Sequence, residues 1–367
     1  MKVLITTPNL ELPGGVANFY RVLRRYLNHG TEYFQVGPSP GEKGGFGALR
    51  RLVADSWRFH RALASRHVEL VHLNPSLVPR ALLRDGLLVL IARLHRCPTL
   101  VLVHGWDPKV QSLIETRFRR LFLLVFGSVD GLVVLAAEFR QVLVDLGVTC
   151  PVYVETTLVD DEVFAVPLAA RRNQGGTAAA NLLYLSRLEK EKGLIETIEA
   201  FALLRETHSG ITLTVVGEGP ERVGAEALVL AKRIPGVTFL GHIEGAAKVR
   251  AFTDADVYVL PTYYAEGMPT SVLEAMAYGL PVVTRPVGGL KDFFEDGRMG
   301  YWTESREASE IAAVLGRLLA DPERLREIGA YNRAYARERF AASRLAERLR
   351  ALYQLTLERA IPAVGRG

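Results

Sequence analysis

The stretch from Leu260 to Val283 constrains the fold of this chain more than any other part of the sequence. An apolar run at 257–260, bounded by turn residues, predicts a buried strand, and a helical pattern follows that starts at Thr270 or Ser271 and stops at Gly279. Similar strands and helices alternate along the rest of the chain. This alternation predicts an α/β fold, with parallel sheets covered by helices on both faces.

Two acids bracket the start of the predicted helix, Glu266 in the loop and Glu274 inside the helix. The backbone N–H groups of residues 270–272 lack helical acceptors, so they form a seat for an anionic group such as a diphosphate. Gly267 leaves room for close backbone approach, and Pro269 suits a helix entrance. With a carboxylate on either side to hold hydroxyls, the stretch predicts a cradle for a sugar nucleotide.

The same residues have a purely structural explanation. Ser271-x-x-Glu274 is also a capping box, in which the glutamate caps its own helix. Capping does not require a second acid in a loop with glycine and proline, so Glu266 favours the binding function.

Residues 266–283, EGMPTSVLEAMAYGLPVV, resemble the E-x7-E signature of retaining glycosyltransferase family 4. Members of that family have the GT-B fold: two Rossmann-like domains that face across a cleft, with a C-terminal helix that crosses back to the first domain. The resemblance implies that Glu266 contacts the transferred sugar and Glu274 holds the ribose. It also implies that phosphate is bound by the backbone of the residues between them: Gly267, Met268, Pro269, Thr270 and Ser271.

A chain of 367 residues is long for one core and predicts two domains. We expect an acceptor-side domain over 1–160, completed by 345–367, and a nucleotide-sugar domain over 175–344. The polar segment 155–173 is the predicted linker.

The first domain contains candidate site residues in two places. Gly14 and Gly15 lie between a predicted strand and helix, where they either line the ligand or form a plain turn. His104 follows a predicted central strand, which is where ligands bind in open α/β sheets. A lone histidine is more often structural, but the resembling family has a similar glycine loop and a histidine that contacts the donor sugar.

In the second domain, Arg187 and Lys192 flank a predicted strand-to-helix turn, and two cations there would neutralise charge on a departing diphosphate. Their segment, SRLEKEKG, resembles the family's Arg-Leu-x-x-x-Lys-Gly phosphate-binding motif. The resemblance also places Gly217 and Ile243 beside the nucleotide. The loop at Gly217 is not a dinucleotide fingerprint, because Arg222 stands where the third glycine belongs.

No cofactor and no metal site are expected. Asp254 and Asp256 precede a strand and belong to a helix end rather than a metal motif, and Cys97 and Cys150 are too few for a thiolate site or a disulfide framework. The two cysteines, and the lack of a signal peptide or a spanning segment, predict a cytoplasmic protein. A formal charge of +5 is too weak to indicate nucleic-acid binding.

Residues 44–67 form a predicted helix with five arginines, a tryptophan and a phenylalanine. Such a helix can lie on anionic lipid as a peripheral membrane contact, or its apolar stripe can face the domain core.

The expected function is a retaining, metal-independent transfer of a hexose or N-acetylhexosamine from a UDP- or GDP-sugar. The acceptor would be a hydroxyl of a glycan or lipid-linked molecule, in polysaccharide or glycolipid synthesis. The alternatives are an NAD-dependent dehydrogenase and a GT-B sugar-nucleotide epimerase.

Overall fold

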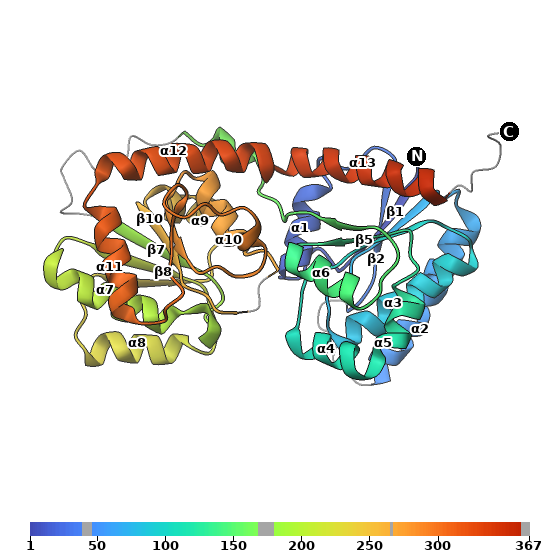
Figure 1. Cartoon of the computed structure of the whole chain (residues 1–367), viewed down its shortest axis with the longest axis horizontal. Helices are drawn as coiled ribbons and strands as arrows, with labels where there is room; N and C mark the ends of the chain where they lie inside the picture. Colours follow the sequence, from blue (N-terminus) through green and yellow to red (C-terminus); the bar gives the residue numbers. More distant parts are fainter. Residues whose placement is uncertain (39–45, 168–179, 265–266, 361–367) are drawn as a thin grey trace. The chain divides into compact units, whose positions relative to one another are not determined.

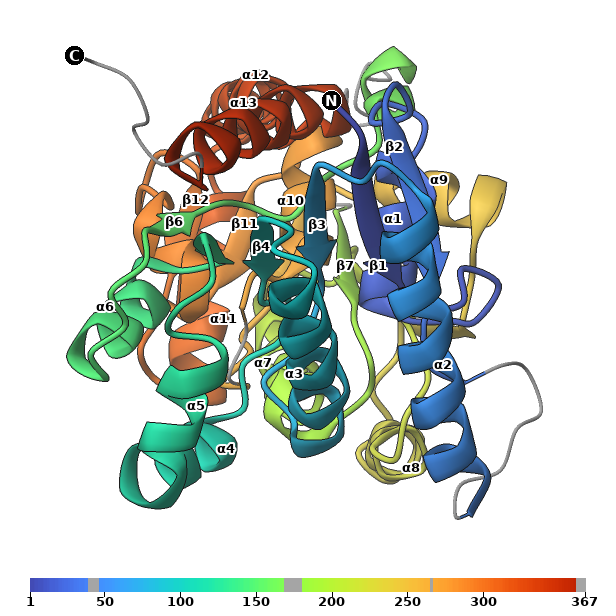
Figure 2. The ribbon, with the colours of Figure 1, turned by 90° about the vertical axis from the view of Figure 1, so that its right-hand side faces the viewer.

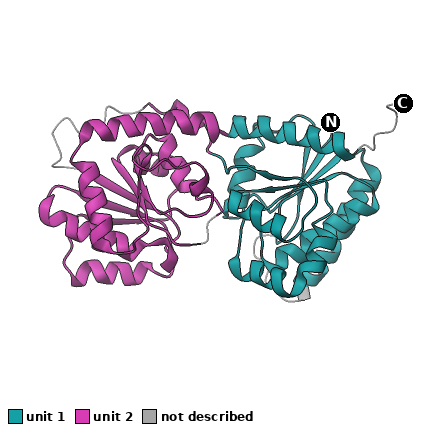
Figure 3. Cartoon of the chain, in the orientation of Figure 1, with its two compact units in different colours: residues 1–158, 342–367 teal, residues 159–341 magenta. Residues whose placement is uncertain are grey.

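The computed structural model describes residues 1–38, 46–167, 180–264 and 267–360. The chain divides into two compact units, one comprising Met1–Leu158 with Ala342–Gly367 and the other Val159–Ala341 (Figure 3). The predicted first domain ended at residue 160 and resumed at residue 345. Part of the predicted linker, from Val159 onward, belongs to the second unit and includes the short 3-10 helix η2 (Asp161–Ala165).

Unit 1 contains a six-stranded sheet in which every pair of neighbours is parallel (Figures 1 and 2). Its strand order is β2-β1-β3-β4-β5-β6. The central strands are apolar and fully buried because helices cover both faces of the sheet. The strands are β1 (Val3–Thr7), β2 (Thr31–Gln35), β3 (Leu70–Leu73), β4 (Thr99–Leu102), β5 (Gly131–Val134) and β6 (Val152–Val154).

The helices of unit 1 form two layers, each with its own hydrophobic cluster. Helices α1 (Gly15–Leu23) and α13 (Ala342–Ala360) pack on one face of the sheet, where Tyr20 and Tyr353 are buried. The other face is covered by α2 (Phe46–Ser65), α3 (Pro79–Leu94), α4 (Pro108–Leu113), the π-helix η1 (Ile114–Phe118), α5 (Arg119–Val125) and α6 (Ala137–Asp145).

The last helix of the chain, α13, is part of unit 1. The Tyr353 hydroxyl lies 2.6 Å from Nδ1 of the buried His72 on β3. Arg348 donates to both carboxylate oxygens of Glu155, at 3.1 and 3.0 Å. The C-terminal helix therefore returns to the first domain, as predicted.

Unit 2 contains a second parallel six-stranded sheet, with the order β12-β11-β10-β7-β8-β9 (Figure 1). The strands are β7 (Asn181–Leu185), β8 (Thr212–Val216), β9 (Val237–Gly241), β10 (Val257–Leu260), β11 (Val282–Thr284) and β12 (Gly300–Trp302). Its helices are α7 (Leu194–Thr207), α8 (Arg222–Ala231), α9 (Gly245–Thr253), α10 (Thr270–Ala277), α11 (Ala308–Leu319) and α12 (Pro322–Arg339), with the 3-10 turns η3 (Lys190–Lys192) and η4 (Gly288–Asp292).

The order of strands in unit 2 fixes where a ligand can bind. From β7 the chain adds β8 and β9 on one side, whereas β10, β11 and β12 extend the sheet on the other side. The loops after β7 and β10 therefore leave the sheet side by side at a topological switch point, the usual binding position in open α/β sheets. The predicted α/β fold is confirmed for both units. Within the described residues, no helix is long and apolar enough to cross a membrane.

Candidate functional site

The loops that follow β7 and β10 are joined at one backbone carbonyl. The carbonyl of Glu191, in η3, accepts hydrogen bonds from the amides of Tyr263 and Tyr264 at 2.8 and 3.1 Å, and from Oγ1 of Thr262 at 3.2 Å. A Cβ on Gly193 would lie 2.7 Å from the carbonyl oxygen of Pro261, and the φ of Gly193 is +78°. This close contact requires glycine, so the two predicted site segments are held together at the switch point.

The two predicted cations of this unit lie at this junction. Nζ of the buried Lys192 is 4.2 Å from the centre of the Tyr264 ring, and the guanidinium carbon of Arg187 is 5.9 Å from it. Arg187 is mostly exposed and pairs with Glu189 at 2.5 Å. An exposed pair of this kind contributes little stability, so Arg187 can change partner when an anion binds. Tyr264 was not predicted from the sequence.

Helix α10 starts at Thr270 with Pro269 as its N-cap and no side-chain cap hydrogen bond. This arrangement excludes the capping box, because Ser271 lies inside the helix. Its hydroxyl is 2.8 Å from that of Tyr258, which also lies 2.8 Å from the carbonyl of Leu185. Since a carbonyl can only accept, Tyr258 donates to it and accepts from Ser271.

The backbone at the start of α10 differs in one respect from the predicted seat for an anion. The Val272 amide donates to the carbonyl of Pro269 at 3.0 Å, so that donor is already used. The Gly267 carbonyl accepts from Gly289 at 2.8 Å, which fixes the loop, and Met268 is buried. Predicted site residue Glu266 lies outside the described residues.

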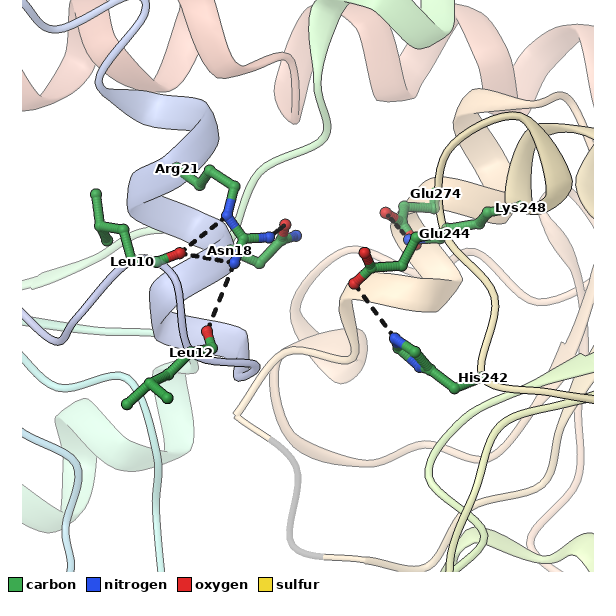
Figure 4. A network of polar contacts seen from close by, with 8 residues as sticks. All are labelled: Leu10, Leu12, Asn18, Arg21, His242, Glu244, Lys248 and Glu274. Atoms are coloured by element: carbon green, nitrogen blue, oxygen red, sulfur yellow. Dashed lines mark hydrogen bonds and ion pairs between the residues drawn. The ribbon is translucent and has the colours of Figure 1, made fainter. Parts of the chain in front are cut away.

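Glu274 is engaged by a cation from another helix. Its Oε1 is 2.7 Å from Nζ of Lys248 on α9, and the Glu274 side chain is largely buried (Figure 4). The pair fixes the carboxylate at the side of α10. Lys248 was missed, because nothing in the sequence indicates that α9 and α10 place these two residues together.

The glycine loop after β8 is explained by packing. The φ of Gly217 is +136°, and a Cβ there would lie 1.8 Å from the carbonyl oxygen of Ser186. The Gly217 amide donates to the Gly241 carbonyl at 2.9 Å. The loop after β8 therefore needs glycine with or without a ligand.

The predicted site residue Ile243 follows β9 and is partly buried. It lies between His242 and Glu244, whose side chains are 3.2 Å apart (Figure 4).

In unit 1, the predicted residues belong to two separate features. Gly14 precedes α1 with a φ of +154°, and no atom lies within 4 Å of a Cβ built on Gly14 or Gly15. His104 is half-buried at the end of β4, and its ring packs edge-on against those of Phe19 and Tyr20 at centroid distances of 4.8 and 5.7 Å.

Asn74, which follows β3, fixes the tautomer of His104. Its Nδ2 donates to the carbonyl of Thr6 at 2.7 Å, so its Oδ1 faces Nε2 of His104 at 3.2 Å as an acceptor. Oδ1 also accepts from the Tyr20 hydroxyl. Nε2 of His104 therefore carries the proton, and Nδ1 is left as an acceptor. Removal from water, with a smaller effect of His72, lowers the pKa of His104 to about 3, so the ring is neutral at pH 7.

Asp254 lies at the end of α9, and Asp256 lies directly before β10. Asp254 is the C-cap of α9, and Oδ2 of the buried Asp256 accepts from the Asn181 amide at 2.8 Å. Within the ranges 1–38, 46–167, 180–264 and 267–360, no group of three or more His, Cys, Asp or Glu side chains is arranged to hold a metal ion.

Comparison with known proteins finds a described family that resembles most of unit 2. Residues 172–335 match the model of the family "Glycosyl transferases group 1". The glycogen synthase of Mycobacterium tuberculosis is 35% identical over 245 residues, which cover 64% of this chain and 57% of that protein. The phosphatidyl-myo-inositol mannosyltransferase of Mycobacterium leprae is 30% identical over 175 residues, 47% of this chain and 46% of that protein. The chain thus spans about half the length of the curated relatives it matches.

Solved structures resemble nearly the whole chain. Anabaena Alr3699/HepE, in complex with UDP and glucose, has a TM-score of 0.73 and 19% identity, over 96% of this chain and 99% of that one. Sucrose-phosphate synthase from Thermosynechococcus elongatus also has a TM-score of 0.73, with 20% identity over 96% and 98% of the two chains. These similarities confirm the predicted two-domain GT-B fold.

Proposed function

We propose that this chain is a glycosyltransferase that moves a hexose or N-acetylhexosamine from a UDP- or GDP-sugar to a hydroxyl of a glycan or lipid-linked acceptor. The observation that carries the proposal is the junction of the loops after β7 and β10, where Lys192 and Arg187 gather around Tyr264. The match of residues 172–335 to a glycosyltransferase family supports it, because this junction lies within the matched segment.

The chemistry of the site suits a nucleotide diphosphate. The cations Arg187 and Lys192, with the positive N-terminal end of α10, would bind the phosphates and stabilise the charge that develops as the diphosphate leaves. The Glu274 carboxylate, fixed by Lys248, would accept hydrogen bonds from the ribose hydroxyls. Because two cations supply the charge that a divalent ion would otherwise provide, we propose that turnover needs no metal.

We propose further that the anomeric configuration is retained, as in the family that the E-x7-E stretch resembles. The acceptor hydroxyl would attack on the face from which the diphosphate leaves, and the leaving phosphate would take the acceptor's proton. Glu266 would contact the transferred sugar without acting as a nucleophile. His104, neutral and with Nδ1 as an acceptor, is suited to accept a hydrogen bond from a sugar hydroxyl.

The test is a donor screen with a matched pair of variants. The protein is incubated with UDP- and GDP-sugars, release of the nucleotide is followed with and without a chelator, and the product's anomeric configuration is read by NMR. Lys192→Ala should lower turnover about a hundredfold or more, the usual effect of losing one charge-stabilising donor. Lys190→Ala, an exposed lysine of the same 3-10 turn, should leave turnover unchanged. Equal rates for the two variants, or no nucleotide release from any donor, would contradict the proposal.

A further inference from the structure

Unit 1 carries large apolar side chains on the outer surface of three neighbouring helices. We call this set the apolar band; it consists of Leu49, Val53 and Trp57 on α2, Leu94 on α3, and Leu121 and Leu124 on α5. The exposed fractions of Trp57, Leu94 and Leu124 are 61%, 74% and 64%. The alternative expected for this helix, an apolar stripe turned to the domain core, applies to Phe59, Ala62 and Leu63, but not to the residues of the band.

Contacts between the helices make the band continuous. The ring of Trp57 stacks on that of His60, with 5.6 Å between centroids, and His60 lies 3.0 Å from the His95 ring, next to Leu94. Arg93 then donates to the carbonyl of Leu124 on α5, at 3.1 and 3.2 Å. Figure 2 shows α2, α3 and α5 on the face of the unit that is turned to the viewer.

The same helices are strongly basic. The segments 46–65, 79–94 and 108–125 contain eleven lysines and arginines but three acids. Two of these acids are buried and paired, Asp55 with Arg58 at 3.1 Å and Asp85 with Arg84 at 2.6 Å. The solvent-facing charge around the band is therefore almost entirely positive.

An arginine-lined hollow adjoins the band on α2. Arg50, Arg51 and Arg58 line it, together with Asp55 and Gly37. The three band residues of α2 each directly precede a residue of this hollow: Leu49 precedes Arg50, Val53 precedes Ala54, and Trp57 precedes Arg58. Two of the band residues, Leu49 and Trp57, are thus each followed in the helix by an arginine, and guanidinium groups bind phosphate well.

We propose that this face of unit 1 docks on the surface of an anionic lipid bilayer, with the apolar band inserted between the headgroups and the arginines on lipid phosphates. A basic amphipathic surface with tryptophan and leucine is the combination that binds such bilayers. A second copy of the chain fits the face poorly, because a two-fold interface would set this cationic surface against itself. The proposal goes beyond the proposed transferase activity and does not depend on it.

The test is vesicle flotation of the full chain. With vesicles of phosphatidylcholine and phosphatidylglycerol the protein should float, and with pure phosphatidylcholine it should remain unbound. The triple variant Trp57→Ser/Leu94→Ser/Leu124→Ser should bind at least about tenfold more weakly, because it removes three inserted side chains. Arg50→Gln/Arg51→Gln should lose the preference for phosphatidylglycerol. The matched control is Val223→Ser/Leu230→Ser, which removes exposed apolar side chains of α8 in the other unit and should float like the parent.

A spectroscopic measurement separates docking from misfolding. The tryptophan emission should shift to the blue on anionic vesicles. Trp57→Phe should float normally while losing most of that shift, since Trp106 is buried and Trp302 is partly buried on β12 of the other unit. Circular dichroism and Tm verify that each variant is folded. The proposal is overturned if the parent protein ignores anionic vesicles, if the α8 control loses binding equally, or if the band only mediates a dimer that sedimentation detects without lipid.

Discussion

The two units contain sheets of equal size, but the turns at their carboxyl ends are built differently. In unit 2, the turns after β7, β8 and β10 touch one another through backbone groups, with glycines at the points of closest approach. In unit 1, the turn at Gly14 is open, and the polar centre is formed by side chains of Tyr20, Asn74 and His104. A site made of backbone is set by the local sequence, whereas a site made of side chains depends on how distant elements pack.

The largest expected difference between the units concerns these glycines. Gly217→Ala should destabilise unit 2 by more than about 4 kcal/mol, because its Cβ would overlap the Ser186 carbonyl at 1.8 Å. Gly14→Ala should cost about 1–2 kcal/mol, since it meets a strained φ but no neighbouring atom. Chemical denaturation of both variants measures the two costs. Equal losses of stability would show that the two turns are packed alike.

The second-largest expected difference is in how the stability of each unit responds to acid. The pKa of His72 and that of His104 are both lowered to about 3, chiefly by burial, and both residues lie in unit 1. In the unfolded chain both histidines take up a proton near pH 6.5, whereas in the folded chain they stay neutral down to about pH 3. The free energy of unfolding is therefore highest above pH 6.5 and decreases as the pH falls toward 3. Between pH 7 and pH 5 the loss is about 2 kcal/mol per histidine.

Hydrogen exchange at decreasing pH, read separately for peptides of each unit, checks this expectation. Unit 1 should open first, and His104→Gln should flatten its pH dependence. His242→Gln is the control, because this exposed histidine lies in unit 2. Earlier opening of unit 2 would contradict the assignment of the acid-sensitive groups.

The smallest expected effect concerns the ion pair between Lys248 and Glu274. Lys248→Met should weaken UDP binding about tenfold, because a hydrogen-bonded carboxylate loses its partner and its fixed position. The penalty for 2′-deoxy-UDP relative to UDP should also shrink. Calorimetric titration measures both effects, with Lys232→Met as control, since Lys232 pairs with Glu199 at 2.9 Å on the surface. An unchanged 2′-deoxy penalty would separate Lys248 from ribose recognition.

The sequence predicted the fold and the segments at the switch point of unit 2 because each is contiguous. Strand, turn and helix follow one another at 257–277, and the glycines and cations of 187–193 form one run. Packing between these runs could not be predicted. The capping-box alternative could be decided only once the first residue of the helix was known. The structure places that residue at Thr270, with Pro269 as the N-cap.

The side-chain partners were missed for a physical reason. Lys248 is 26 residues from Glu274, and Asn74 is 30 residues from His104, so neither pair has a local signal. In the sequence, nothing distinguishes Tyr264 from other aromatic residues. Its role follows from the turn after β7, which places Lys192 against its ring. Such contacts follow from the order of strands in a sheet, which the alternation of strands and helices does not determine.

The place of α13 in unit 1 has a consequence for synthesis on the ribosome. Residues 1–158 emerge first, but the layer formed by Leu345, Leu349 and Tyr353 is translated last, after all of unit 2. The second unit has its whole sequence available while the first still lacks a helix that covers one face of its sheet. The first unit therefore exposes apolar surface until α13 is synthesised. If the ribosome stalls before residue 342, this surface stays exposed, so that chaperones can bind it and the chain can aggregate.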